Sequence, residues 1–376
     1  MGWKKIVMIG PVYPFKGGIS HYTGMMYRCL REKHETQMVS YRMQYPKFLF
    51  RKEQKDFQND QFKIEDAKFW LHTANPLNII RTAQRIRKEY PDLVIVQWWH
   101  PYFAPCYWLL CKFLGKVKIL FLCHNVFPHE RFPMDHWLTK QALRQGDYFL
   151  VQSRTDEADL KQICPGAKYR RVVHPTYQAF RMTGISKNAS REKLGMDPSE
   201  RVLLFFGFVR PYKGLKYLLQ AMPAIVSQVK GIRLLVVGDF DGDKGDYERL
   251  IREESLESCV RIVEGYIPDQ EVETYFSACD LVVLPYESAT QSGIVQIAYG
   301  FQKPVIATRV GGLPEVVAEG KTGLLAKPKD PASLAEAVIR FFALGDSVNW
   351  KENIKQEEKK YSWDRMEEAV EAFYGE

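Results

Sequence analysis

The sequence predicts an α/β protein made of two doubly wound units, each with a parallel sheet covered by helices on both faces. Short runs of apolar and β-branched residues recur along the chain without alternating polar positions, as expected of strands buried on both sides. Stretches with helical spacing separate these runs. The pattern occurs twice, on either side of a polar and irregular segment, which indicates two domains.

Apolar runs mark the predicted strands in chain order. The first half contributes "KIVMIG", "DLVIVQ", "KILFLCH", "DYFLVQS" and "RRVVHP", and the second half "RVLLFFG", "RLLVVG", "VRIVEG", "DLVVLPY" and "KPVIAT". Helical spacing is clearest in "GLKYLLQAMPAIVSQV", "DQEVETYFSAC" and the closing "YSWDRMEEAVEAFYGE". The polar stretch at 181–200 is predicted to be a linker, so the domains are expected over 1–180 and 201–358.

Length and composition exclude several classes of protein. The 376 residues suit two domains, and 46% hydrophobic with 26% charged residues argues against a disordered or fibrous chain. The uncharged stretch 93–111 contains Gln97, Pro101 and Pro105, so we expect a strand, a loop and a helix start rather than a membrane span. No secretory signal opens the chain, and seven scattered cysteines without a CxxC pair indicate reduced thiols in a cytoplasmic protein.

The basic surplus belongs to the first half of the chain. Residues 1–180 hold 28 Lys and Arg against 15 Asp and Glu, a balance of +13, and the remainder has a balance of −5. Such a surface attracts anionic partners, including the anionic face of a membrane. We therefore expect a cytoplasmic protein that binds peripherally at the inner face of the cell membrane; a solvated surface without a partner is the alternative.

Two loops carry the strongest chemical signals. Gly17 and Gly18 stand where a strand passes into a helix, so bare backbone can let an anion approach the helix N-terminus; a plain turn is the alternative. In "GFVRPYKGL", Arg210 and Lys213 follow a strand, and Gly214 opens a helix. Both cations suit phosphate oxygens; the alternative is that they are surface charges at a helix start, which would give the same sequence pattern. The two loops together predict a diphosphate held between the domains.

With these motifs the chain resembles the retaining GT-B glycosyltransferases, specifically glycosyltransferase family 4. The resemblance rests on "PFKGGISHYT", "CHN", "GFVRPYKGL", "VVGD", "GYIPDQEVETYFSACDLVVLPY", "KPVIATRVGGLPEVV", "GKTGLL" and the closing "YSW" helix. It implies two Rossmann-like domains facing across a cleft, with the C-terminal helix of 359–376 packed back on the first domain. It also implies transfer of a sugar from a nucleoside-diphosphate donor, with retention of configuration and without a bound metal.

The resemblance also assigns roles to residues. His124, Arg210 and Lys213 are expected to be catalytic, with Lys213 on the donor diphosphate and His124 near the reacting carbon of the sugar. The turn at Tyr266 and Ile267 is expected to contact the nucleobase. The full set of expected donor-binding residues is Gly17, Gly18, Gly207, Arg210, Lys213, Tyr266, Ile267, Glu287, Gln291, Ser292, Gly293 and Ile294.

The chain departs from the family pattern in two places. Phe208 follows the glycine where the family places its arginine, and Arg210 comes two residues later. Ala289 and Ile297 occupy the positions of the family's two glutamates. Glu287, Gln291 or Gln296 are the candidate substitutes, together with the backbone N–H groups of "ATQSGI".

Acceptor contacts are expected from polar and aromatic side chains of the first half, with filling of the core as the alternative for the aromatics. The candidates are His21, Trp98, Trp99, His100 and His129. No metal site is expected, because the spacing of His124 and His129 fits no common ligand pattern.

The predicted activity is transfer of a sugar from a UDP- or GDP-sugar to a glycan or lipid-linked acceptor in surface polysaccharide or glycoconjugate biosynthesis. The alternatives are a nucleotide-sugar-binding relative with weak or no transfer activity and a nucleotide-sugar 2-epimerase of the same fold. No cofactor besides the donor and no nucleic acid partner is expected. A dinucleotide oxidoreductase fits worse, because "IGPVYPFKGG" lacks the GxGxxG spacing.

Overall fold

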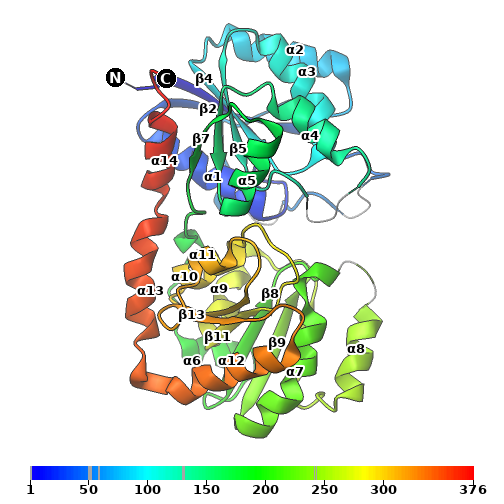
Figure 1. Ribbon diagram of the computed structural model, residues 1–376, viewed down its shortest axis with the longest axis vertical. Coiled ribbons are helices and arrows are strands. Elements are labelled where there is room, and N and C mark those ends of the chain that lie inside the picture. The colour runs from blue at the N-terminus through cyan, green and yellow to red at the C-terminus, as the bar shows by residue number, and fades with distance from the viewer. Residues whose placement is uncertain (1, 50–52, 58–59, 129–131, 241, 243) are drawn as a thin grey trace. The chain divides into compact units, whose positions relative to one another are not determined.

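The computed structural model describes residues 2–49, 53–57, 60–128, 132–240, 242 and 244–376, and the chain divides into two compact units. The first unit joins residues 1–173 to residues 362–376, and the second holds residues 174–361 (Figure 1). The chain therefore leaves the first unit once and returns to it for its last helix.

Parallel strands form the sheet of the first unit in the order β3-β2-β1-β4-β5-β6-β7. The chain starts at a central strand, moves to one edge, and then crosses back to build the other half. This reversal defines a doubly wound sheet and confirms the predicted fold class for this unit. The strands are β1 (Lys5–Ile9), β2 (Glu35–Met43), β3 (Lys68–His72), β4 (Leu93–Trp98), β5 (Lys118–Cys123), β6 (Tyr148–Val151) and β7 (Lys168–Arg171).

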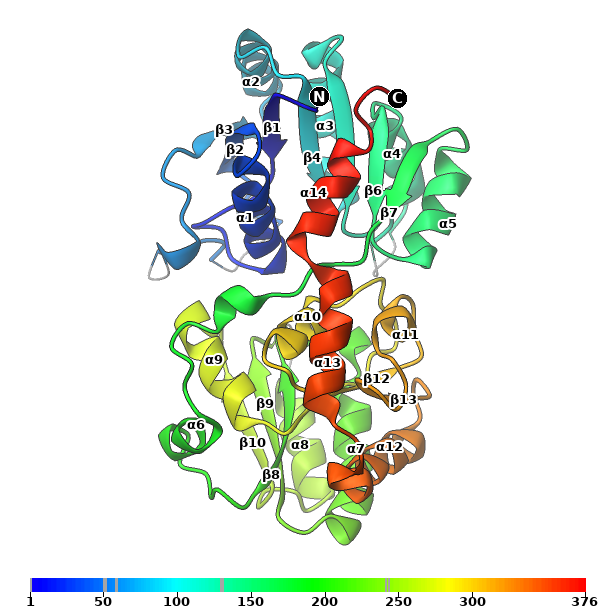
Figure 2. The same cartoon turned by 90° about the vertical axis from the view of Figure 1, so that its left-hand side faces the viewer.

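Helices cover both faces of this sheet. α1 and α14 lie side by side on one face, while α3 packs between α2 and α4 on the other (Figures 1 and 2). Every residue of β4 is buried, which explains why this strand is an unbroken apolar run up to Gln97. The helices are α1 (Gly18–Arg31), α2 (Pro76–Lys88), α3 (Ala104–Leu114), α4 (Asp135–Leu143), α5 (Arg154–Ile163) and α14 (Trp363–Glu371), with 3-10 turns η1 (Asp60–Phe62) and η2 (Pro101–Phe103).

Helix α14 is part of the hydrophobic packing of the first unit. The indole N–H of Trp3 donates to the carbonyl of Val370 at 3.0 Å, and the ring of Tyr148 stacks on Phe373 with centroids 4.8 Å apart. Tyr22 of α1 meets the edge of Trp363 at 5.1 Å. Residues more than 300 positions apart in the sequence therefore share one core.

The sheet of the second unit repeats the same winding, in the order β10-β9-β8-β11-β12-β13. Its strands are β8 (Arg201–Phe206), β9 (Ile232–Gly238), β10 (Val260–Glu264), β11 (Leu281–Leu284), β12 (Val305–Thr308) and β13 (Gly323–Ala326). Its helices are α6 (Lys187–Lys193), α7 (Leu215–Gln228), α8 (Lys244–Glu253), α9 (Asp269–Ala278), α10 (Gly293–Gly300), α11 (Leu313–Val316), α12 (Pro331–Leu344) and α13 (Trp350–Glu358). Short 3-10 turns are η3 (Gln178–Phe180), η4 (Pro211–Lys213), η5 (Gly345–Ser347) and η6 (Lys359–Tyr361).

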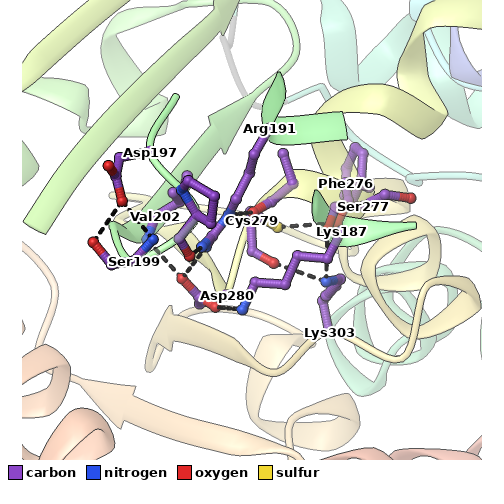
Figure 3. A network of polar contacts seen from close by, with 12 residues as sticks. Lys187, Arg191, Asp197, Ser199, Val202, Phe276, Ser277, Cys279, Asp280 and Lys303 are labelled. Carbon is purple, nitrogen blue, oxygen red and sulfur yellow. Dashed lines mark hydrogen bonds and ion pairs between the residues drawn. The ribbon is translucent and has the colours of Figure 1, made fainter. Parts of the chain in front are cut away.

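The segment 181–200, predicted to be a linker, belongs to the second unit, and the division falls at residues 173/174 and 361/362. Its helix α6 packs against α9, and Arg191 is fully buried between them and the sheet. The guanidinium donates to Asp280 at 2.8 Å and to the carbonyl of Ala278 at 3.0 Å, and Lys187 also pairs with Asp280 (Figure 3). The segment is polar because it carries this network, so composition alone does not distinguish it from a linker.

No helix among the described residues is long and apolar enough to cross a membrane. The uncharged stretch 93–111 forms β4, η2 and most of α3, as predicted. The cysteines of the described chain are all free thiols, and Cys106, Cys111, Cys123 and Cys279 are buried.

Candidate functional site

In the second unit, β8 and β11 lie side by side at the centre of the sheet, although β9 and β10 come between them along the chain. The connections that leave their carboxyl ends run to opposite halves of the sheet. In doubly wound folds a crevice for a ligand opens at this point of reversal. The loop after β8 carries Lys213, and the loop after β11 leads into α10, so the donor residues predicted in these two loops of the second unit gather at this edge.

Gly214 fixes the path of the loop after β8. It closes η4 and opens α7 with φ +67°, a left-handed conformation that favours glycine. A Cβ at this position would lie 1.9 Å from the carbonyl oxygen of Pro285 at the end of β11. The backbone N–H of Glu287 donates to the carbonyl of Tyr212 at 2.7 Å. The two loops are thereby tied together, and Lys213 is held between them.

The ammonium of Lys213 has no hydrogen bond or ion pair within the described part of the chain. Its Nζ lies 3.4 Å from where a Cβ on Gly207 would stand and 5.7 Å from the ring centroid of Tyr286. Burial lowers the pKa of Lys213 to about 8, and the nearby charge of Arg210 adds to the effect. The cation is therefore incompletely compensated by the protein itself, which is the state expected of a group that receives an anion.

The N-terminus of α10 approaches the same place. The side chain of Ile294 in its first turn lies 3.5 Å from the Cβ position of Gly207. Ser292 precedes the helix without making a side-chain capping hydrogen bond, and its hydroxyl faces the Tyr286 hydroxyl at 3.4 Å. Gln291 and Gly293 flank it and are half-buried. An uncapped helix start beside a lysine suits a phosphate group.

Glu287, a predicted replacement for the absent family glutamates, is already engaged by two lysines, and its contact with a donor remains a prediction. Its carboxylate pairs with Lys329 at 3.1 Å and Lys216 at 3.3 Å. Burial would raise the pKa of Glu287, but the hydrogen bonds from these lysines outweigh it and hold the pKa below its usual value. Ala289 and Ile297 are buried apolar residues, each 8% exposed. The side chain of Gln296 is fully buried, and its amide oxygen and nitrogen have no hydrogen-bond partner among the described residues.

Tyr266 and Ile267 follow Gly265 after the edge strand β10 and precede α9. Both are half-buried at the same carboxyl edge of the sheet as Lys213. Their predicted contact with a nucleobase remains a prediction.

In the first unit, Gly17 and Gly18 lie at the start of α1, as predicted. Gly17 is the N-cap residue with φ +104°, and its carbonyl accepts from the N–H of Ser20 at 3.0 Å. No atom lies within 4 Å of where a Cβ would stand on either glycine, and no acidic side chain occupies the first turn. The turn is thus open to an anion, and β1 and β4, the strands at the reversal of this sheet, end beside it.

His124 follows β5 and belongs to a polar group that the sequence did not reveal. Its Nε2 donates to the side-chain oxygen of Gln97 at 2.8 Å, which assigns the ring proton to Nε2. Its ring meets Tyr22 edge-on at 4.7 Å. Gln97 is fully buried in β4, so a polar residue inside an apolar strand was the available signal.

The residues expected to contact the acceptor differ in how far they are buried. The prediction for Trp98 is wrong. Trp98 is completely buried and donates its indole N–H to the carbonyl of Val126 at 3.1 Å, so it fills the core. Trp99 packs against the edge of the same hydrophobic cluster, with its ring centroid 4.2 Å from that of Phe103, and donates to the hydroxyl of Tyr45 at 3.0 Å. Both Trp99 and His100 are half-buried.

His100 accepts the N–H of Tyr102 at 3.0 Å as the N-cap of η2 and stacks on Phe132 with centroids 5.7 Å apart. His21 stands in the first turn of α1 against Phe62 at 5.0 Å. His129 lies outside the described residues.

Comparison with known proteins identifies the family. A model described as "Glycosyltransferase Family 4" matches residues 16–175, and one described as "Glycosyl transferases group 1" matches residues 200–343. The chain belongs to glycosyltransferase family 4. Each of the two matches covers most of one unit, so the assignment rests on both units rather than on one motif.

Curated relatives of this family 4 chain include D-inositol 3-phosphate glycosyltransferases. The protein from Corynebacterium urealyticum is 30% identical over 248 residues, which cover 62% of this chain and 58% of the relative. The protein from Segniliparus rotundus is 31% identical over 215 residues, which cover 54% of this chain and 48% of the relative. The chain thus spans about half of the length of these relatives.

Solved structures share the fold over almost the whole chain. A sucrose-phosphate synthase from Thermosynechococcus elongatus has a TM-score of 0.74 at 19% identity, covering 99% of this chain and 98% of its own. The Anabaena protein HepE in complex with UDP and glucose has a TM-score of 0.77 at 16% identity, covering 98% of this chain and 100% of its own. The family 4 chain therefore has the GT-B fold.

Proposed function

We propose that this family 4 chain is a retaining glycosyltransferase that moves a sugar from a UDP- or GDP-sugar to a glycan or lipid-linked acceptor. The observation that carries the proposal is the desolvated ammonium of Lys213, which has no hydrogen bond or ion pair among the described residues, at the point of strand reversal in the second unit. The crystallised relative HepE was solved with UDP and with UDP-glucose, which supports a nucleotide-sugar donor.

Lys213 acts on the charge that develops during transfer. Breaking the bond between sugar and phosphate leaves an oxocarbenium-like sugar and adds negative charge to the diphosphate. A cation fixed in a partly desolvated place stabilises that charge without reorganising first. The start of α10 adds backbone N–H groups and the positive end of its dipole to the same task.

No protein base is required when a diphosphate oxygen accepts the proton of the acceptor hydroxyl on the face from which the leaving group departs. The new glycosidic bond then forms on that face, and configuration is retained. His124 is proposed to contact the transferred sugar, its ring held by Gln97 and Tyr22. No metal ion is needed in this scheme, since Lys213 and the helix start supply the positive charge.

The test is Lys213→Ala, with Lys216→Ala as the matched control. Loss of the ammonium removes about 2–4 kcal/mol of charge stabilisation, so we expect transfer to fall by roughly 30- to 1000-fold. Lys216 already pairs with Glu287, and its loss is expected to change transfer by only a few-fold. Transfer is measured with UDP- and GDP-sugars in the presence of a chelator. Activity of Lys213→Ala within a few-fold of the unchanged protein would overturn the proposal.

A nucleotide-sugar-binding protein without transfer activity is the second candidate, because Ala289 and Ile297 stand where family members carry glutamates. It predicts tight donor binding with no product or only slow donor hydrolysis. Incubating the donor alone also tests the 2-epimerase alternative, since an epimerase converts the donor without an acceptor.

Peripheral binding at an anionic membrane is proposed for the first unit. Besides its basic residues, this unit exposes Leu77 of α2, Trp108 of α3 and Trp137 of α4, whose helices neighbour one another. Binding to anionic vesicles is expected to weaken as salt rises, because the Debye length shrinks to about 10 Å at 0.1 M. Cosedimentation with anionic and neutral vesicles measures this. Equal binding at low and high salt would contradict the electrostatic contribution.

A further inference from the structure

One group of potential metal ligands lies outside the candidate active site, within the described part of the first unit. His34 stands between α1 and β2, and Glu367 and Glu371 lie one turn apart on α14. The Nε2 of His34 is 3.4 Å from Oε1 of Glu367 and 3.5 Å from Oε1 of Glu371. These ligand atoms come from both ends of the chain.

The protonation of the His34 ring is fixed by its other nitrogen. Nδ1 lies 2.7 Å from the carbonyl oxygen of Trp3, which can only accept, so Nδ1 carries a proton. In the neutral ring Nε2 then presents a lone pair to two carboxylates. The two carboxylate oxygens beside this lone pair can share a cation with Nε2, either a proton or a metal ion.

The distances favour a metal ion over a proton. A charge-assisted hydrogen bond from an imidazolium to a carboxylate is about 2.7–2.9 Å long, and neither carboxylate approaches His34 so closely. Ligands at about 2.0–2.2 Å around a tetrahedral Zn²⁺ stand roughly 3.3–3.5 Å from one another. The separations on both sides of His34 match that spacing.

The surroundings also resemble those of metal ligands. Ligating histidines commonly donate the other ring N–H to a carbonyl, as His34 does to Trp3. The backbone N–H of Trp3 donates to Glu371 Oε1 at 3.2 Å, and Lys33 Nζ lies 2.6 Å from Glu367 Oε2. The side chains of His34 and Glu367 are 5% exposed, whereas that of Glu371 is 27% exposed. Each ligand is oriented by a partner, and the partly exposed Glu371 leaves one side of the group in contact with solvent.

We propose that His34, Glu367 and Glu371 bind a Zn²⁺ ion that fastens α14 to the β1–β2 region of the first unit. The imidazole favours Zn²⁺ over Mg²⁺ or Ca²⁺, and the two carboxylates neutralise its charge. A water completes the tetrahedron. The site is structural and separate from the transfer reaction, and it consists of residues of one unit.

The experiment uses the full chain freed of metal with EDTA and then titrated with ZnCl₂. We expect one Zn²⁺ per chain by calorimetry and metal analysis, and a higher melting temperature with Zn²⁺ than with EDTA. His34→Ala and the isosteric Glu371→Gln are each expected to weaken binding at least ten-fold. The matched control is His136→Ala on α4, which is expected to bind Zn²⁺ like the unchanged protein. Circular dichroism establishes that each variant is folded.

Three results would overturn the site. The first is no Zn²⁺ binding by the unchanged chain. The second is equal binding by the chain and both ligand variants, or a thiolate-to-metal charge-transfer band when Co²⁺ replaces Zn²⁺, since either assigns the ion to cysteines. The third is a melting temperature that rises on acidification and does not respond to Zn²⁺, which assigns the cation at His34 to a proton.

Discussion

At the scale of single residues, burial of Lys213 lowers the stability of the fold but suits the binding of an anion. A buried ammonium disfavours folding, because the unfolded chain keeps the charge in water. Its pKa is about 8 in the folded chain and 10.5 in the unfolded one, so the contribution of this group to stability rises with pH between these values. The folded protein tolerates the desolvation of this ammonium at a position where a bound anion would compensate its charge. Conflict of this kind is typical of binding sites.

Donor affinity is therefore expected to depend on pH through Lys213. Below pH 8 the lysine is charged before and after a diphosphate binds, so the Kd is nearly constant. Above pH 8 the free protein has lost the proton and must regain it, so the Kd rises by up to about tenfold per pH unit. Calorimetry with UDP and GDP from pH 7 to 9.5 measures the effect.

Lys213→Arg is the control for this profile, because the guanidinium stays charged throughout. Its Kd is expected to stay level over the same range, whatever its absolute value. A level profile for the unchanged protein would show that Lys213 does not contact the diphosphate.

At the scale of elements, helix α6 shows how a polar segment becomes part of a domain. Arg191 joins α6 to the end of α9 and, through Asp280, to the N–H of Val202 at the start of β8 (Figure 3). Lys303 adds hydrogen bonds to the carbonyls of Ser277 and Cys279 at 3.1 and 2.7 Å. The network satisfies polar groups that the packing of α6 on α9 buries.

Replacement of Arg191 by methionine is expected to lower the free energy of unfolding of the second unit by about 3–5 kcal/mol, because buried partners lose their donor. Arg181→Met, in the exposed part of the same segment, is the control and is expected to stay within about 0.5 kcal/mol. Urea unfolding followed by circular dichroism gives the midpoints. If both variants unfold at the midpoint of the unchanged chain, the network does not hold the segment.

Strands that form apolar runs could be predicted from the sequence, including the edge strand β10 as "VRIVEG", whereas β2 and β3 could not. β4 and β5 are buried apolar runs, whereas β3 and β7 are mostly half-buried and mix polar with aromatic residues, so they lack a clear period. The predicted strand "RRVVHP" overlaps only the end of β7. β2 was missed for the same reason, since polar residues such as Gln37 interrupt it. Predicted boundaries failed where a polar segment is internally paired, as at Arg191.

The candidate site was predicted where local sequence decides the geometry. Gly214 permits the left-handed turn that places Lys213, so the motif predicts the position. Long-range contacts could not be predicted from the sequence. Glu287 is paired with Lys329, which is 42 positions away, and Trp98 is completely buried while its neighbour Trp99 is only half-buried at the edge of the same cluster. Neither fact can be decided from spacing along the chain.

At the scale of the whole molecule, the chain begins and ends in the same unit. β1 lies at the centre of the first sheet and α14 covers it beside α1 (Figure 2). The second unit, in contrast, is one continuous stretch, residues 174–361, with its own sheet and core. Loss of the C-terminal residues should therefore affect the two units unequally.

Truncation after Tyr361 tests this asymmetry. Without residues 362–376, Trp3, Tyr22 and Tyr148 lose the side chains that cover them, and we expect amides of β1, α1 and β6 to exchange at least tenfold faster. The strands β8 to β13 are expected to keep their protection, because no residue of the second unit is removed. Hydrogen exchange read by mass spectrometry resolves the two units. Glu368→Ala, an exposed change on α14, is the control and is expected to leave both unchanged. Unaltered protection of β1 in the truncated chain would mean that the first unit is stable without its last helix, and faster exchange throughout would mean that the units unfold together.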